Sequence, residues 1–131
     1  MTDQGPRDRG PISSRQVVLV VEDEPLLRMM AVDLVEDAGF EAVEAADATE
    51  AVRILEARTD IRIMFTDIDM PRGIDGLMLA ALVRRRWPPI EIIVTSGFRT
   101  FNDIDLPVRS EFFSKPYDRA KVTAAMKRMA H

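Results

Sequence analysis

Residues 16–39 read QVVLVVEDEPLLRMMAVDLVEDAG and decide the fold class. The run from Gln16 to Val21 is short, apolar and β-branched, as in a central parallel strand that is buried on both faces. Pro25 suits the first turn of a helix, and apolar residues then recur at helical spacing as far as Gly39, a typical helix stop. A buried strand followed at once by an amphipathic helix predicts an α/β fold on a parallel sheet.

The same alternation continues to the end of the chain. Further short apolar runs predict strands at residues 40–43, 61–66, 90–95 and 111–114, and helical periodicity predicts helices at residues 47–58, 76–86 and 117–130. The segment 96–110 contains Asp103, Asp105 and Pro107, so at most a short helix is expected near residues 99–104. Five strands and about five helices predict a flavodoxin-like (βα)5 three-layer sandwich with a parallel five-stranded sheet in the order 2-1-3-4-5.

The composition excludes several kinds of site. The 131 residues suffice for one domain, and the absence of cysteine excludes disulfides and thiolate chemistry. The single histidine, His131, is the last residue, which argues against a catalytic triad or a histidine-ligated metal. A net charge of -4, from 18 Lys and Arg against 22 Asp and Glu, argues against nucleic acid or an anionic membrane as partner.

The first residues differ from the rest of the chain. Residues 1–15 hold glycines, prolines and charges but almost no apolar side chain, so we expect a disordered leader ahead of a domain at residues 16–131. No apolar run reaches the roughly 20 residues that a membrane helix needs, and no signal peptide opens the chain. A cytoplasmic protein is therefore expected.

Polar side chains stand where four of the expected strands end: Glu22, Asp23 and Glu24, then Asp67 and Asp69, then Thr95 and Ser96, and finally Lys115. In the expected strand order the winding reverses between the first and third strands, so these ends meet in one crevice. Carboxylates within about 4–6 Å of one another repel, which raises one pKa unless a cation neutralises them. With neither histidine nor cysteine in this crevice, the ligands are all oxygens, which points to Mg²⁺ or Mn²⁺.

Four stretches at these strand ends resemble one known family, the response-regulator receiver domain of two-component signalling. They are VVLVVEDEPLLR, FTDIDMPRGIDG, IIVTSG and FFSKPY, and the likeness covers residues 16–129. The resemblance implies a domain that accepts a phosphoryl group from a histidine kinase, a histidine phosphotransfer protein or a small phosphodonor. It implies that the domain is a switch and not an enzyme, and that it presents a changed surface to a downstream protein target. It also implies a domain that is monomeric or that dimerises on phosphorylation.

By the same resemblance, Asp67 is the phosphoacceptor. Glu22 and Asp23 would bind Mg²⁺, and Asp67 and the backbone carbonyl of Asp69 would complete the protein ligands. A carboxylate that attacks phosphorus must overcome repulsion between two anions, so positive charge around the transferring oxygens is what the chemistry requires.

The resemblance gives three further residues a role. Thr95 would hydrogen-bond a phosphoryl oxygen, and Lys115 would pair with it. A lysine about 4 Å from the phosphoryl group contributes about 4 kcal/mol at an effective dielectric constant near 20, before desolvation is subtracted. Phe112, three residues before Lys115, holds the switch position that turns inward on activation, together with Thr95.

The sequence departs from the family at two places, and alternatives stay open. The turn MPRGIDG is one residue longer than the commonest family form, and Ser96 replaces a small alanine. Asp67-Ile68-Asp69 also fits a Mg²⁺-dependent aspartyl-phosphatase-type enzyme, and a glutamate with an Asp-x-Asp fits a Mg²⁺-binding nucleic-acid module. Because the chain ends near the close of the last expected helix, we expect a stand-alone receiver with no effector domain.

Overall fold

The computed structural model describes residues 15–71, 73–99 and 104–130. The expected leader at residues 1–15 lies almost wholly outside this part. The described residues form five strands: β2 (Val17–Val21), β3 (Glu41–Ala45), β4 (Ile61–Asp67), β5 (Glu91–Ser96) and β6 (Ser110–Ser114). They also form four helices: α1 (Pro25–Asp37), α2 (Ala48–Ala57), α3 (Gly76–Arg86) and α4 (Arg119–Met129).

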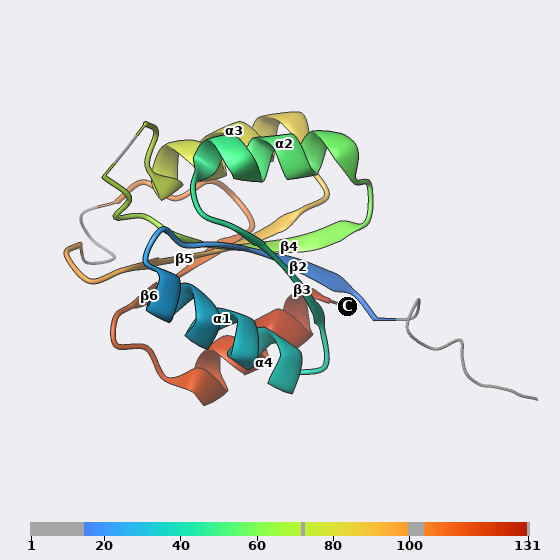
Figure 1. Cartoon of the computed structure of the whole chain (residues 1–131), viewed down its shortest axis with the longest axis vertical. Helices are drawn as coiled ribbons and strands as arrows, with labels where there is room; N and C mark the ends of the chain where they lie inside the picture. The colour runs from blue at the N-terminus through green and yellow to red at the C-terminus, as the bar shows by residue number, and fades with distance from the viewer. Residues whose placement is uncertain (1–14, 72, 100–103, 131) are drawn as a thin grey trace, which may run out of the picture.

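The sheet has the order β3-β2-β4-β5-β6, and every neighbouring pair is parallel. This is the order 2-1-3-4-5 counted along the chain, so the predicted flavodoxin-like topology is confirmed. Helices α2 and α3 cover one face of the sheet, and α1 and α4 cover the other (Figure 1). The strand order places the carboxyl ends of β2 and β4 side by side, which is where the winding direction reverses.

The sheet is buried on both faces. Val18 and Val20 of β2 pack in one apolar cluster with side chains of α1 and α4, whereas Leu19 packs in a second cluster with side chains of α2 and α3. All five residues of β2 are buried. The continuous apolar run of this strand therefore has the cause that the sequence indicated, because alternate side chains enter two different cores.

An acidic side chain caps the first turn of each described helix. Asp47 accepts a hydrogen bond from the Glu50 N–H at 2.8 Å and is the N-cap of α2. Glu24, Asp75 and Asp118 hold the same position at α1, α3 and α4. Such caps satisfy N–H groups that have no partner within the helix, so they fix where each helix begins.

The segment between β5 and β6 contains no helix within its described residues, 97–99 and 104–109. The short helix expected near residues 99–104 falls mainly on residues 100–103, outside the described part. Ile104 and Leu106 pack against the cluster under α2 and α3. The Arg84 guanidinium donates hydrogen bonds to the carbonyls of Val108 and Arg109 at 2.8 and 3.0 Å, which ties this segment to the end of α3.

No helix in the described part of the chain is long and apolar enough to cross a membrane.

Candidate functional site

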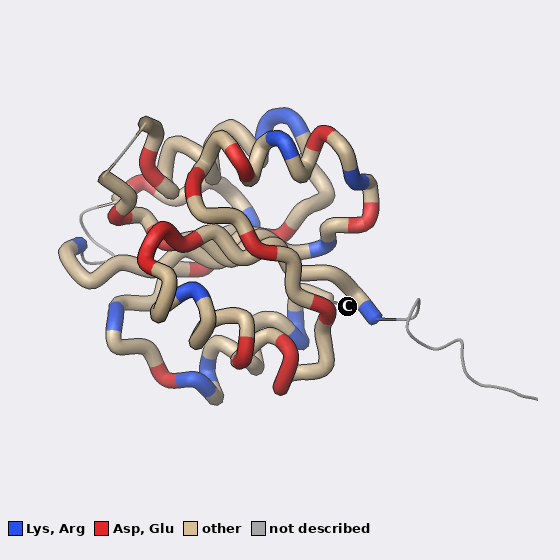
Figure 2. The backbone as a smooth tube through the Cα atoms, viewed as in Figure 1, with Lys and Arg blue, Asp and Glu red and all other residues tan. Residues whose placement is uncertain are grey.

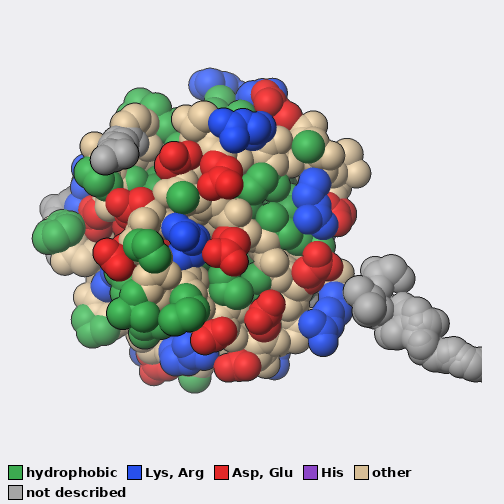
Figure 3. Space-filling model, viewed as in Figure 1, with side chains coloured by type: hydrophobic (Ala, Val, Ile, Leu, Met, Phe, Trp, Pro, Cys, Tyr) green, Lys and Arg blue, Asp and Glu red, His purple; other side chains and the backbone are tan. Residues whose placement is uncertain are grey.

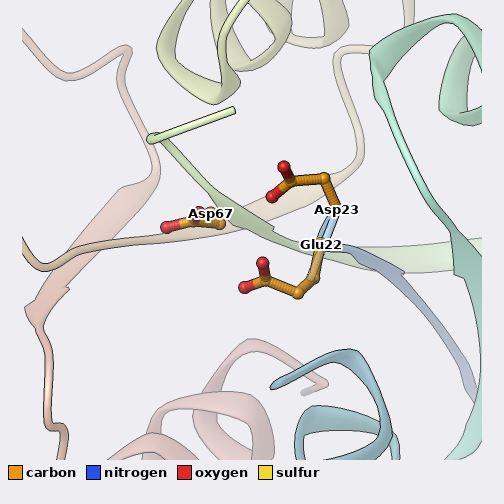
Figure 4. Close-up of side chains that lie close together, drawn as sticks. All are labelled: Glu22, Asp23 and Asp67. Atoms are coloured by element: carbon orange, nitrogen blue, oxygen red, sulfur yellow. The ribbon is translucent and has the colours of Figure 1, made fainter. Parts of the chain in front are cut away.

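Three carboxylates meet beyond the carboxyl ends of β2 and β4. Glu22 and Asp23 follow β2, Asp67 ends β4, and one oxygen from each lies within 4.8 Å of the others. Figure 4 shows the three carboxyl groups directed to the same side of the sheet edge, and Figure 2 shows the acidic residues between β2 and α1. The crevice predicted from the strand order therefore exists, and these three of its acids converge there.

The Glu22 side chain is held at both carboxylate oxygens. The Lys115 ammonium donates a hydrogen bond to Oε1 at 3.2 Å, and the Glu24 N–H donates one to Oε2 at 3.1 Å. Burial raises the pKa of Glu22, although the Glu24 hydrogen bond opposes this and the Asp67 charge adds to it. A carboxylate that is costly to keep ionised is thus fixed in one position.

Asp67 is 4% exposed, and its ion pair with Lys115 offsets part of the cost of burying its negative charge. The Lys115 Nζ lies 3.1 Å from Asp67 Oδ1, yet this buried oxygen accepts no hydrogen bond within the described residues. Burial raises the pKa of Asp67, with Lys115 opposing the shift. Burial lowers the pKa of Lys115, but its contacts with Asp67 and Glu22 outweigh this and leave the pKa raised.

These residues fit a hard divalent cation. Three carboxylates face one lysine, so the cluster keeps an excess of negative charge, and Asp67 Oδ1 is a buried acceptor without a hydrogen bond in the described part of the chain. Oxygen ligands of this kind suit Mg²⁺, which is typically held by one or two carboxylates, waters and a phosphate oxygen. The donor set contains neither nitrogen nor sulfur, which matches the expectation of Mg²⁺ or Mn²⁺.

Thr95 and Lys115 share a cavity with Asp67. Thr95 is buried on β5 and pairs in register with Asp67 on β4. A cavity of about 390 Å³ is lined by Asp67, Glu22, Thr95 and Lys115 at its polar end, and elsewhere by residues of β2, α1 and the segment before α4. The side chains of four strand ends thus border one space, as the sequence predicts.

Phe112 lies one strand further from the acids. It is half-buried on β6, pairs in register with Val94 of β5, and packs against the apolar cluster under α2 and α3. Val94 directly precedes Thr95, so the two residues expected to act in switching occupy neighbouring positions on adjacent strands.

The Asp69 side chain is directed to the loop after β5. Its Oδ2 accepts hydrogen bonds from the Ser96 hydroxyl at 2.8 Å and from the Gly97 N–H at 3.1 Å. The Ser96 Oγ in turn accepts hydrogen bonds from two backbone N–H groups, those of residues 98 and 99. Asp69 thus joins the loop after β4 to the loop after β5, and its backbone carbonyl as a metal ligand stays a prediction.

Two residues that the sequence reasoning left without a role also shape the site. Gly76 begins α3, and a Cβ added there would lie 1.9 Å from the carbonyl oxygen of Asp67. Arg28 of α1 donates a hydrogen bond from Nη1 to the carbonyl oxygen of Glu22 at 2.9 Å. The signal for Gly76 was the Asp-Gly pair in the quoted turn, whereas nothing in the spacing of Arg28 points to a backbone carbonyl.

Comparison with known proteins gives the class of this domain. The family model described as "Response regulator receiver domain" matches residues 18–127. A response regulator receiver protein from Pseudomonas putida has a crystal structure that superposes with a TM-score of 0.76 at 28% identity, covering 88% of this chain and 98% of that one. The chain therefore belongs to the receiver domain family of two-component response regulators, as the resemblance predicts. This match favours the receiver over the two alternatives left open by the sequence.

Longer proteins contain similar domains. The sensor kinase CckA of Brucella abortus is 30% identical over 122 residues, which is 90% of this chain and 13% of the kinase. A putative NtrX-like response regulator of Rickettsia felis is 28% identical over 115 residues, which is 85% of this chain and 24% of that protein. The chain thus spans a quarter or less of the length of these two relatives.

Proposed function

We propose that this chain is a cytoplasmic phosphoacceptor switch. In this proposal Asp67 takes a phosphoryl group from a histidine kinase or histidine phosphotransfer protein, and the modified domain binds a downstream protein target. The observation that carries the proposal is a buried carboxylate with one oxygen that accepts no hydrogen bond from the described residues, beside a lysine and two further acids. The domain is a switch and not an enzyme, because the product stays attached to the protein.

The proposed chemistry is a transfer between oxygens or from nitrogen to oxygen. An Asp67 carboxylate oxygen bonds to phosphorus while the bond between phosphorus and the donor breaks, and the donor leaves as a carboxylate, an imidazole or, from phosphoramidate, ammonia. Both reactants are anionic, so the barrier is largely electrostatic. Lys115 offsets part of the charge on the transferring group, and the Thr95 hydroxyl donates a hydrogen bond to one of its oxygens.

Glu22, Asp23 and Asp67, with the backbone carbonyl of Asp69, are the proposed ligands of Mg²⁺, and Mn²⁺ suits the same oxygens. When bound, the ion supplies positive charge to the carboxylates and the phosphoryl oxygens. The excess of three carboxylates over one lysine supports this part of the proposal.

The switch is proposed to run from Thr95 to Phe112. New bonds from Thr95 and Lys115 to a phosphoryl group would contribute about 1.5–3 kcal/mol each. Carrying a two-state equilibrium from 1:99 to 99:1 takes about 5.5 kcal/mol. Phosphorylation alone is therefore expected to shift the population in part, and binding of the target completes the shift.

The exposed side of α1 supports a protein as phosphodonor. Leu26, Met29 and Met30 are 57%, 56% and 48% exposed, and Figure 3 shows hydrophobic side chains gathered over this corner of the molecule. Leu27 and Met30 also line the cavity that reaches Asp67. An apolar surface that runs into the site suits a helix of the donor protein, whose phosphohistidine would enter at the polar end of the cavity.

The direct test is labelling by a small phosphodonor. The parent chain and Asp67→Asn are incubated with acetyl phosphate or phosphoramidate and Mg²⁺, and their intact masses are measured. We expect a gain of one phosphoryl group in the parent alone. Equal labelling of both chains, or no labelling of either, removes Asp67 as the acceptor.

A second measurement separates the protein donor from the small one. Met29 is exposed on α1 and does not line the cavity. Met29→Glu is expected to slow transfer from a phosphorylated histidine phosphotransfer protein much more than it slows labelling by acetyl phosphate. Equal slowing with both donors would contradict the proposed use of α1.

A further inference from the structure

Arg28 contacts the backbone of the site but does not line its cavity. The residue lies in α1, and its Nη1 donates a hydrogen bond to the Glu22 carbonyl oxygen at 2.9 Å, while its Nε lies 3.1 Å from Glu44 Oε1 on β3. The side chain is 22% exposed, so the guanidinium is partly withdrawn from solvent. It bridges the turn that carries Glu22 and Asp23 to the neighbouring strand, and it does not line the cavity next to Asp67.

Glu22 needs such a bridge because of where it lies. It stands one residue beyond β2, where the regular ladder with β3 ends at Val21 and Ala45. Its N–H still donates to the Ala45 carbonyl at 3.1 Å, and Arg28 provides the donor for its own carbonyl. Both backbone groups of Glu22 are thereby fixed, and the path of the chain into Asp23 is fixed with them.

The length of the Glu22 side chain makes this backbone hold more important. A glutamate has one more rotatable bond than an aspartate, so ordering its carboxylate costs more conformational entropy, and a fixed backbone reduces the freedom that cation binding would have to remove. The two oxygens are bound by Lys115 and by the Glu24 N–H. Arg28 also closes the first turn of α1 through its own N–H, which donates to the Glu24 carbonyl at 2.8 Å. The whole turn from Glu22 to Glu24 is therefore anchored to Arg28.

We infer that Arg28 is a positioning residue for divalent-cation binding, which it promotes by holding the Glu22 backbone; this inference rests on the proposed function. An arginine is suited to the task because its planar group reaches a carbonyl and a carboxylate at once, whereas a lysine offers a single ammonium. Removing a residue that contacts and orients a metal ligand without binding the metal itself changes metal affinity about 10–100-fold. Arg28 contacts the backbone of Glu22 and not its carboxylate, so we expect an effect near the lower limit, about tenfold.

The test measures Mn²⁺ binding directly, by the loss of the electron paramagnetic resonance signal of free Mn²⁺ during titration of the intact chain. The parent, Asp67→Asn, Arg28→Met and Arg28→Lys are compared. Arg28→Met is expected to weaken binding about tenfold, and Arg28→Lys by an intermediate factor. Glu44→Gln is the matched control, because it removes the negative charge from the other partner of the guanidinium. The loss of an exposed ion pair of this kind is expected to change affinity by about twofold at most.

A role confined to folding is separated by a second readout. For a positioning residue, Arg28→Met should need more Mg²⁺ for half-maximal labelling by acetyl phosphate but reach the parent rate at saturating Mg²⁺. Parent-like Mn²⁺ affinity in Arg28→Met overturns the inference and leaves the proposed function standing. If Arg28→Met does not fold, parent-like Mn²⁺ affinity in Arg28→Lys overturns it equally. Absence of any Asp67-dependent Mn²⁺ binding in the parent overturns the proposed function and this inference with it.

Discussion

Replacing Asp67 by asparagine should stabilise the protein when no divalent cation is present. Asp67, Glu22 and Asp23 present oxygens within 4.8 Å of one another, and Lys115 lies 3.1 Å from Asp67. At an effective dielectric constant near 20, each repulsion at 4.8 Å costs about 3.5 kcal/mol and the attraction at 3.1 Å contributes about 5.4 kcal/mol. The two repulsions thus exceed the attraction by about 1.5 kcal/mol. Desolvation of the buried carboxylate acts in the same direction.

Thermal unfolding with a chelator present measures this difference. A gain of about 1.5 kcal/mol in a domain of this size raises Tm by about 5 °C. Asp37→Asn is the control, because the Asp37 side chain is 79% exposed and its removal is expected to change stability by no more than about 0.5 kcal/mol.

Adding Mg²⁺ should reduce or reverse the order of stability. A ligand that binds only the folded state at ten times its Kd adds about 1.4 kcal/mol to the free energy of unfolding. The parent should gain more than Asp67→Asn, because the variant lacks one of the three carboxylates. A Tm of Asp67→Asn equal to or below that of the parent in the chelator would refute the argument that the acids repel one another in the free site.

Three further changes test the surroundings of the site. Gly76→Ala would place a Cβ 1.9 Å from the Asp67 carbonyl oxygen, so the strand end must shift by about 1 Å. We expect the free energy of unfolding in urea to fall by about 1–3 kcal/mol and labelling by acetyl phosphate to become slower. Parent-like values in both measurements would contradict the close approach. The pKa values of Glu22 and Asp67 are raised in the folded state, so between the unfolded-state and folded-state pKa values the folded state holds more protons than the unfolded state. The contribution of these two groups to the free energy of unfolding therefore falls as pH rises through this range. The stability advantage of Asp67→Asn over the parent should grow with pH, and a constant difference would count against this prediction. Ser96→Ala removes the donor to Asp69 and the acceptor for two backbone N–H groups, so we expect a loss of about 1–3 kcal/mol by the same urea measurement, and Asp69→Ala should make Ser96→Ala less costly than it is alone.

The strand order and the composition of the site could be predicted because both follow from chain direction. Short apolar runs alternating with amphipathic helices leave few parallel arrangements, and the residue after each run must lie at the same edge of the sheet. The sequence alone therefore places Asp67 and Thr95, which pair in register, in one crevice. The segment between β5 and β6 was less predictable, because its two aspartates and its proline remove the helical signal without indicating another structure.

The contacts that hold the proposed metal ligands and the nearby loops in place depend on the direction of long side chains, which is a different property of the chain. Arg28 and Arg84 both have the spacing of ordinary helix-surface residues, yet each guanidinium turns to backbone carbonyls at the end of a strand or in a loop. A carbonyl has no sequence signature, since every residue carries one. Pattern analysis can therefore identify the acids proposed to bind a cation, but it cannot identify the arginine that contacts the backbone of one of them.

The acids that need support from a second element are those that lie beyond the regular sheet, and this bears on the proposed switch. In the proposed switch, Asp67 and Thr95 meet the phosphoryl group from the ends of β4 and β5, where the sheet fixes their backbone. Glu22 lies one position beyond that support, and the structure supplies the missing restraint from α1 and β3. The same argument applies to Asp69, which lies two residues beyond Asp67 and is held by Ser96 from the end of β5. Two acids outside the regular sheet are thus each held by a second element, so a shift at the end of β5 on phosphorylation would reach the cation side of the site through Ser96.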